Sequence, residues 1–182
     1  YLNAVFFPRI YTCKNIFLQE GWHYEIFNKD DPIKYNGVVY NEMKGAYSSA
    51  DEVLNEVLMN GTFDGTTYQY ESGGDPECIP NLTYEDFIGF HKKYYSPTNS
   101  YIFLYGKMDM EERMDFLDKE YLSKFEKIDV NPIIKKSESQ EKLVEKEIFY
   151  PIAQNEILDN KTNLGLGIAL TGATDIKDDI AF

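Results

Sequence analysis

The chain has 182 residues, of which 43% are hydrophobic and 15% aromatic, and this composition excludes a disordered chain because it supplies enough apolar surface for a core. The formal net charge is −13 and the isoelectric point is near 4.5, so nucleic acid and anionic membranes are excluded as partners by repulsion. Basic peptides or cations fit this charge. An acidic surface that merely keeps the chain soluble fits it as well.

The two cysteines, Cys13 and Cys78, lack the C-x-x-C spacing of a zinc site. Two cysteines do not make a disulfide framework, so reduced thiols and a cytoplasmic location are expected. No uncharged apolar run in the sequence is long enough to cross a bilayer. The sequence therefore predicts a chain with no membrane partner.

The first predicted elements are short. Leu2, Val5 and Phe6 have the spacing of a helix, and Pro8 ends or kinks it. Periodicity and turn residues then predict a helix over 16–22, a strand over 24–27 and a turn over 28–32.

A longer helical segment from 37 to 59 is predicted to break in two. Gly45 interrupts it, and Ser48 or Ser49, followed by acidic residues, offers a new N-cap. The next segment, 60–80, holds six glycine and proline residues and little periodicity. A loop is expected there.

Two amphipathic helices and one strand are predicted further along the chain. Thr83 is a natural N-cap for the first helix, and Pro97 ends it. A strand of β-forming residues follows over 100–105 until Gly106, and Asp109 caps the second helix. The side chains expected on the buried faces of these helices are Phe87, Phe90, Tyr94, Met110, Met114, Leu117, Tyr121 and Leu122.

Between 124 and 146 the chain becomes charged and loses its periodicity, which indicates a linker. After it, 147–150 and 164–170 are predicted to be strands of a new domain. The chain begins at Tyr1 and stops at Phe182 in what look like helices, so both ends are expected to be cut.

Sequence motifs exclude several chemistries. Gly165-Leu166-Gly167 lacks the third glycine of a dinucleotide loop, and small residues in a buried strand explain it. His23 and His91 are the two histidines of the chain, and neither has an H-x-x-x-H or H-x-x-E-H partner. A complete local zinc site is therefore excluded, and packing or capping roles are expected for both.

Glu42 is the candidate for chemistry. It follows the apolar run Gly37-Val38-Val39-Tyr40, which indicates a carboxylate near the start of a buried helix. A buried carboxylate needs a partner charge, a proton or a metal. The residues alone leave open a metal, an ion pair with Lys44 and simple partial exposure.

Four segments carry a family resemblance: Phe17-Leu18-Gln19-Glu20-Gly21-Trp22-His23-Tyr24-Glu25, Tyr35-Asn36-Gly37-Val38-Val39-Tyr40-Asn41-Glu42-Met43-Lys44-Gly45-Ala46, Glu71-Ser72-Gly73-Gly74-Asp75-Pro76 and Phe90-His91-Lys92-Lys93-Tyr94-Tyr95-Ser96-Pro97-Thr98-Asn99-Ser100. In this order and spacing they resemble the presequence proteases, a branch of the pitrilysin and insulysin-like inverzincin zinc metallopeptidases. The resemblance extends over essentially the whole chain.

The resemblance implies Zn²⁺ as the cofactor and Glu42 as its third protein ligand, with two histidines and the general-base glutamate coming from an H-x-x-E-H helix. That motif is not in this sequence and would precede Tyr1. The implied function is an internal fragment, inactive by itself, of a metalloendopeptidase that degrades short unfolded peptides. The alternatives are a non-catalytic scaffold or peptide-binding relative of the same fold, and a self-standing acidic peptide-binding module.

The implied fold class is α+β. Residues 1–125 would be the latter part of a LuxS/mitochondrial-processing-peptidase-like metallopeptidase domain, 126–146 a linker, and 147–182 the first strands of a second, homologous domain. The expected partners are peptide substrates and the remaining domains of the same polypeptide. An organelle is the alternative to the cytoplasm, because the resemblance includes organellar relatives.

Overall fold

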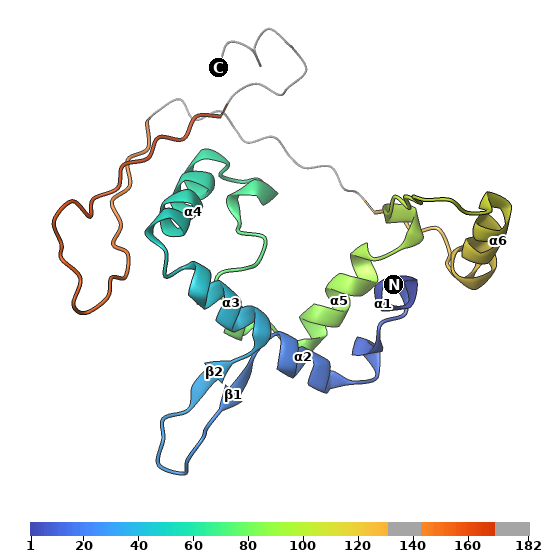
Figure 1. Cartoon of the computed structure of the whole chain (residues 1–182), viewed down its shortest axis with the longest axis horizontal. Helices are drawn as coiled ribbons and strands as arrows, with labels where there is room; N and C mark the ends of the chain where they lie inside the picture. The colour runs from blue at the N-terminus through green and yellow to red at the C-terminus, as the bar shows by residue number, and fades with distance from the viewer. Residues whose placement is uncertain (131–142, 170–182) are drawn as a thin grey trace, which may run out of the picture. The chain divides into compact units, whose positions relative to one another are not determined.

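The structure is a computed structural model that describes residues 1–130 and 143–169 (Figure 1). The chain divides into two compact units: the first comprises Tyr1–Tyr40 and Glu77–Ile133, and the second comprises Asn41–Pro76 and Ile134–Phe182. Most of the predicted linker and the end of the predicted second domain lie outside the described residues. The domain boundaries drawn from the sequence therefore stay predictions.

Three helices form the centre of the first unit. Helix α1 spans Leu2–Phe6, α2 spans Lys14–Glu20 and α5 spans Tyr84–Tyr94, in agreement with the apolar spacing of the sequence. Helix α2 packs on α5 through Phe17 and Phe87, whose ring centroids are 5.5 Å apart. The unit also contains the short 3-10 helices η1 (Arg9–Tyr11), η3 (Ile79–Asn81), η4 (Pro97–Asn99) and η5 (Leu122–Lys124).

Both N-caps predicted in this unit are confirmed. Thr83 Oγ1 accepts a hydrogen bond from the backbone N–H of Asp86 at 3.1 Å, and Asp86 Oδ2 accepts one from the backbone N–H of Thr83 at 3.0 Å. Asp109 caps helix α6, Met110–Glu120, by accepting from the backbone N–H of Glu112 at 3.1 Å.

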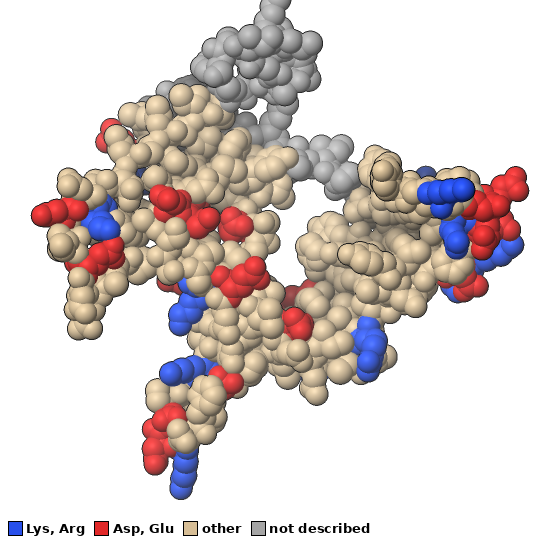
Figure 2. Space-filling model, in the orientation of Figure 1, with Lys and Arg blue, Asp and Glu red and all other residues tan. Residues whose placement is uncertain are grey.

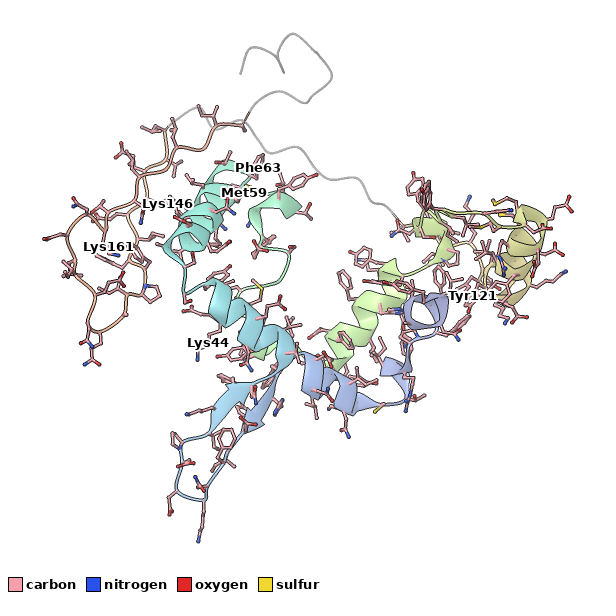
Figure 3. All side chains as sticks on the ribbon, viewed as in Figure 1. Lys44, Met59, Phe63, Tyr121, Lys146 and Lys161 are labelled. Carbon is pink, nitrogen blue, oxygen red and sulfur yellow. The ribbon has the colours of Figure 1, made fainter. Side chains whose placement is uncertain are left out.

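The apolar faces of α5 and α6 are less buried than predicted. Leu117 and Tyr121 are buried, with Tyr121 at the end of α6 (Figure 3). By contrast, Phe90 is 59% exposed, and Met110 and Met114 are both 53% exposed. The helical period marks an apolar face correctly, but it does not say whether another element covers that face.

The sheet of the described chain is one antiparallel hairpin. Strand β1, His23–Glu25, pairs with β2, Lys34–Asn36, so that Tyr24 lies opposite Tyr35 with ring centroids 5.3 Å apart. The strand predicted over 24–27 is thus confirmed in part. The polar β2 was not predicted, because three residues are too few to show an alternating pattern. The hairpin projects from the helices of its unit (Figure 1).

Three predicted strands are not formed in the described residues. The segments 100–105, 147–150 and 164–169 have no ladder partner there, and Tyr101 is fully exposed. A β-forming sequence becomes a strand only when a neighbouring strand takes up its backbone hydrogen bonds. Helices with one small sheet agree with the α+β class, whereas the finer fold assignment stays a prediction.

The second unit is built on two consecutive helices. Helix α3, Val38–Ala46, starts in the first unit, and α4 spans Ala50–Thr62 with Ser49 as its N-cap residue. The predicted break near Gly45 is therefore confirmed. A short 3-10 helix, η2 (Thr67–Gln69), follows.

The two ends of the segment 143–169 lie against α4. A Cβ at Gly165 would be 2.7 Å from Leu58 Cδ1, so the glycine permits a close approach to the helix. Lys146 Nζ also donates to Asn60 Oδ1 at 3.1 Å (Figure 3). The prediction of a buried strand here is wrong, because Leu166 is 74% exposed.

Candidate functional site

Glu42 lies one turn into α3, but it is not buried. Tyr40 and Met43 form the buried face of the helix at 9% and 8% exposure, whereas Glu42 is exposed. The helix expected to be buried is covered on one face only, because a helix divides an apolar run between its faces, and exposure is the alternative found for the carboxylate. Val38 and Val39, at 51% and 38% exposure, lie on the uncovered face.

The carboxylate of Glu42 has no hydrogen bond and no ion pair among the described residues. Lys44 is two residues away, a spacing at which helical side chains do not face each other, and it points away from α3 (Figure 3). Val38 and Val39 lie four and three residues before Glu42, so they share its face. This face therefore combines an unpaired carboxylate with uncovered apolar side chains.

A close backbone contact at the base of the hairpin fixes the start of α3. A Cβ at Gly37 would lie 2.7 Å from the carbonyl carbon of Gly21 and 2.8 Å from the Cα of Trp22, and φ of Gly37 is +153°. The backbone N–H of Tyr40 donates to the Gly21 carbonyl at 3.3 Å. Space and backbone conformation both require glycine at position 37.

A glycine-containing turn lies against the buried face of α3, within the second unit. Glu71 Oε1 accepts from Ser72 Oγ at 3.2 Å and from the backbone N–H of Gly73 at 3.3 Å. The backbone N–H of Gly74 donates to the Glu71 carbonyl at 3.1 Å, and φ of Gly74 is +93°. Residues 71–74 therefore form a turn held by its own hydrogen bonds.

Both histidines are used in packing, as predicted. His91 Nδ1 lies 2.6 Å from the Tyr11 hydroxyl, Nε2 lies 2.8 Å from the Val5 carbonyl oxygen, and the ring stacks on Tyr95. A carbonyl oxygen can only accept, so Nε2 carries a hydrogen, and in the neutral ring Nδ1 accepts from Tyr11. His23 Nδ1 lies 2.6 Å from a backbone carbonyl oxygen.

The Tyr11 phenol, which lies next to His91, has a shifted pKa. Burial, and secondarily repulsion from Tyr84, raises the pKa of the Tyr11 phenol above its ordinary value. The phenol therefore stays protonated and remains a hydrogen-bond donor to His91.

Within residues 1–130 and 143–169, no three His, Cys, Asp or Glu side chains come close enough to hold a metal ion. Cys13 carries a free, half-buried thiol. A catalytic zinc site needs three protein ligands, and the exposed, unpaired carboxylate of Glu42 fits one of those positions. The assignment of Glu42 as a metal ligand stays a prediction.

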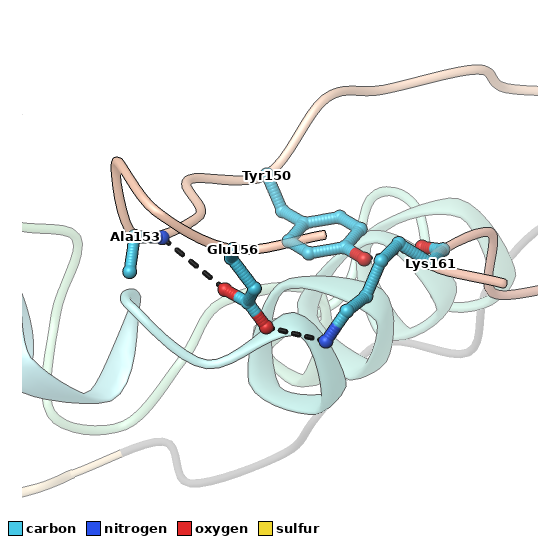
Figure 4. Close-up of polar contacts among 4 residues, drawn as sticks. All are labelled: Tyr150, Ala153, Glu156 and Lys161. Carbon is cyan, nitrogen blue, oxygen red and sulfur yellow. Dashed lines mark hydrogen bonds and ion pairs between the residues drawn. The ribbon is translucent and has the colours of Figure 1, made fainter. Parts of the chain in front are cut away.

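The second unit also holds a polar depression that was not predicted. Glu156 and Lys161 form an ion pair in its lining, and the backbone N–H of Ala153 donates to Glu156 Oε2 at 3.2 Å (Figure 4). The hydrogen bond from Lys161 lowers the pKa of Glu156 and raises the pKa of Lys161. The depression has a volume of about 340 Å³ and is lined by Ser48, Ala50, Tyr150, Pro151, Ile152, Glu156, Asn160, Lys161 and Asn163.

This depression could not be found from the sequence, because opposite charges five residues apart in a loop have no periodic signal. Its two charged side chains neutralise each other, so it presents no net charge to a ligand. Figure 2 shows the charge on one face of the molecule, where acidic side chains are spread over several elements and do not form a single patch. None of the described helices is long and apolar enough to cross a membrane.

Comparison with known proteins shows the family. The sequence profile described as the Peptidase M16 inactive domain matches residues 81–182, and the chain belongs to the peptidase M16 family. It is 51% identical to the protein named Protein HypA of Clostridium perfringens (strain 13 / Type A) over 182 residues, which are 100% of this chain and 19% of that protein.

Two organellar relatives are similar as well. The chain is 48% identical over 126 residues to presequence protease 1, chloroplastic/mitochondrial, of Arabidopsis thaliana, covering 69% of this chain and 12% of that protein. It is also 48% identical over 126 residues to the mitochondrial presequence protease of Drosophila melanogaster, covering 68% and 12%. The resemblance to presequence proteases is confirmed. The chain spans about a fifth or less of the length of these relatives.

Proposed function

We propose that the chain is part of a zinc-dependent metalloendopeptidase that degrades short, unfolded peptides, and that Glu42 is one of its zinc ligands. The similarity to proteins named presequence proteases supports the peptidase class. The observation that carries the proposal is the face of α3, where a carboxylate without a partner lies beside uncovered valines. A face of this kind suits a ligand shared with another part of a longer polypeptide.

In this proposal the described residues bind and orient, and they do not complete a site. Helix α3 directs the Glu42 carboxylate away from the core, and the contacts of Tyr40 and Met43 hold the helix. When bound, zinc would lower the pKa of a coordinated water and polarise a peptide carbonyl. The other ligands and the general base would come from the rest of the polypeptide, so the chain alone would be inactive.

The proposed partners are peptide substrates and the remaining domains of the same polypeptide. Two of the relatives are named as mitochondrial or chloroplastic, and the bacterial relative has no compartment in its name. A cytoplasmic location remains our proposal for this chain, with an organelle as the alternative.

A second candidate is a non-catalytic relative of the same fold that acts as a scaffold or binds peptides. The description of the matched profile as an inactive domain favours it for residues 81–182. Glu42 lies outside that range, so this description does not bear on it. The two candidates differ in whether the full-length protein binds zinc through Glu42.

The test is zinc affinity and peptide hydrolysis of the full-length polypeptide with Glu42→Gln, measured by competition with a chelator and with a fluorogenic peptide. Because a neutral amide is a poorer ligand than a carboxylate, zinc affinity should fall at least about 100-fold, more than for loss of a residue that only orients a ligand. Glu52→Gln, an exposed glutamate in the first turn of α4, is the matched control and should change neither quantity. Unchanged zinc affinity in Glu42→Gln would favour the non-catalytic relative.

A further inference from the structure

Gly73 lies directly against the side chain of Met43 in the second unit. A Cβ built at Gly73 would overlap Met43 Sδ and would lie 2.9 Å from Cε and 3.4 Å from Cγ. Side-chain atoms in folded proteins do not approach this closely, so any residue other than glycine would displace Met43 or the turn. Glycine is needed here for space, since its backbone is not in the left-handed region.

The two partners of this contact have little freedom to move apart. The turn is closed by the hydrogen bonds that Glu71 accepts from Ser72, Gly73 and Gly74. Met43 is 8% exposed and is packed on the buried face of α3. A methionine can change rotamers, but a buried one must find an unfilled space to do so.

The position of Met43 is linked to that of Glu42 by the helix itself. The two residues are neighbours in α3, one on its buried face and one on its exposed face. The part of a push on Met43 that its side-chain torsions do not absorb moves the backbone of α3, and Glu42, on the same turn of the helix, moves with it. Metal–ligand distances tolerate only about 0.2 Å, and catalytic groups about 0.5 Å.

We propose that Gly73 is a positioning residue, whose missing side chain lets the turn of residues 71–74 support Met43 and so set the place of the Glu42 carboxylate. This inference rests on the proposed zinc function of Glu42. Gly73 touches neither metal nor substrate in this proposal. It acts through Met43 alone, which makes the effect dependent on the size of that side chain.

A double-mutant cycle in the full-length polypeptide tests this dependence. Gly73→Ala should weaken zinc affinity about 10-fold, the lower end of the range for residues that orient a metal ligand without touching the metal. In a Met43→Ala background the same change should cost less than about 2-fold, because the atoms that the new Cβ meets are gone. Gly74→Ala, which strains the backbone of the same turn, is the control and should show no such rescue.

A spectroscopic measurement separates positioning from general loss of structure. With cobalt in place of zinc, the visible absorption bands report ligand geometry. They should change in Gly73→Ala, and they should be the same in the double variant as in Met43→Ala alone. If Gly73→Ala does not fold, the double variant should, and an unfolded double variant would overturn the inference. An equal zinc loss in both backgrounds would overturn it too, provided that Glu42→Gln abolishes binding. Binding unchanged in Glu42→Gln would instead overturn the proposed function.

Discussion

The polar side chains of His91 and of Glu42, on helix α3, differ in whether they have partners within the protein. Both ring nitrogens of His91 are hydrogen-bonded, one to the Tyr11 hydroxyl and one to the Val5 carbonyl oxygen. The Glu42 carboxylate has no partner among the described residues and lies beside exposed valines. A polar group bonded within the protein fixes structure, whereas an exposed carboxylate without a protein partner is bonded only to water and is available to an outside ligand.

The first prediction tests whether Glu42 needs further zinc ligands from outside this chain. The 182-residue chain alone should neither bind zinc at submicromolar affinity nor hydrolyse peptides, because one carboxylate cannot replace three converging ligands. Titration calorimetry with zinc and a fluorogenic peptide assay measure both properties. Stoichiometric zinc uptake, or cleavage that a chelator stops, would show a site that the described residues do not reveal. His23→Ala, His91→Ala and Glu42→Gln would then locate it.

The second prediction concerns how much the hydrogen bonds of His91 contribute to the free energy of unfolding. His91→Ala should lower the free energy of unfolding by about 2 kcal/mol, since two hydrogen bonds and a ring contact are lost at about 1 kcal/mol for each hydrogen bond. Tyr11→Phe removes one of these bonds and should lower it by about 1 kcal/mol or less. Urea unfolding of both variants measures this order. A larger effect for Tyr11→Phe would show that His91 is not the centre of the cluster.

The same contrast explains what the sequence could predict. The cap at Thr83 and the break near Gly45 follow from local rules, and both are present. The packing role expected for His91 is present too, but its partners Tyr11 and Val5, on other elements, were not predicted. The exposure of Phe90 and the unpaired segment 100–105 depend on neighbouring elements, which no local pattern specifies.

The candidate site divides in the same way. The sequence placed Glu42 on a helix correctly and left its burial open, because an apolar run does not say which of its residues face outward. The contact between Met43 and Gly73 joins residues thirty positions apart in the sequence. A glycine in a loop indicates a turn, but it does not predict such a contact. The ligand role of Glu42 came from family resemblance and remains a prediction.

The third prediction concerns the capping box of α5 and has the smallest effect. The hydrogen bonds from the side chain and the backbone N–H of Thr83 lower the pKa of the Asp86 carboxyl below its ordinary value. A carboxyl whose pKa is lowered on folding stabilises the protein above its unfolded pKa of about 3.9, and this contribution is lost as the pH falls through the lowered folded value. The cap should therefore help at neutral pH and fade in acid.

Thr83→Ala should lower the free energy of unfolding by about 1 kcal/mol at neutral pH. The difference between Thr83→Ala and the unmodified chain should shrink as the pH falls below about 4, because a protonated Asp86 no longer accepts from Thr83 as a carboxylate does. Urea midpoints across this range measure it, with Asp86→Asn as the matched control that removes the titrating group. If Asp86→Asn kept the full acid dependence of the unmodified chain, another carboxyl would be responsible. The cap of α5 would then depend on the Thr83 hydroxyl alone, and its contribution to stability would not change with pH.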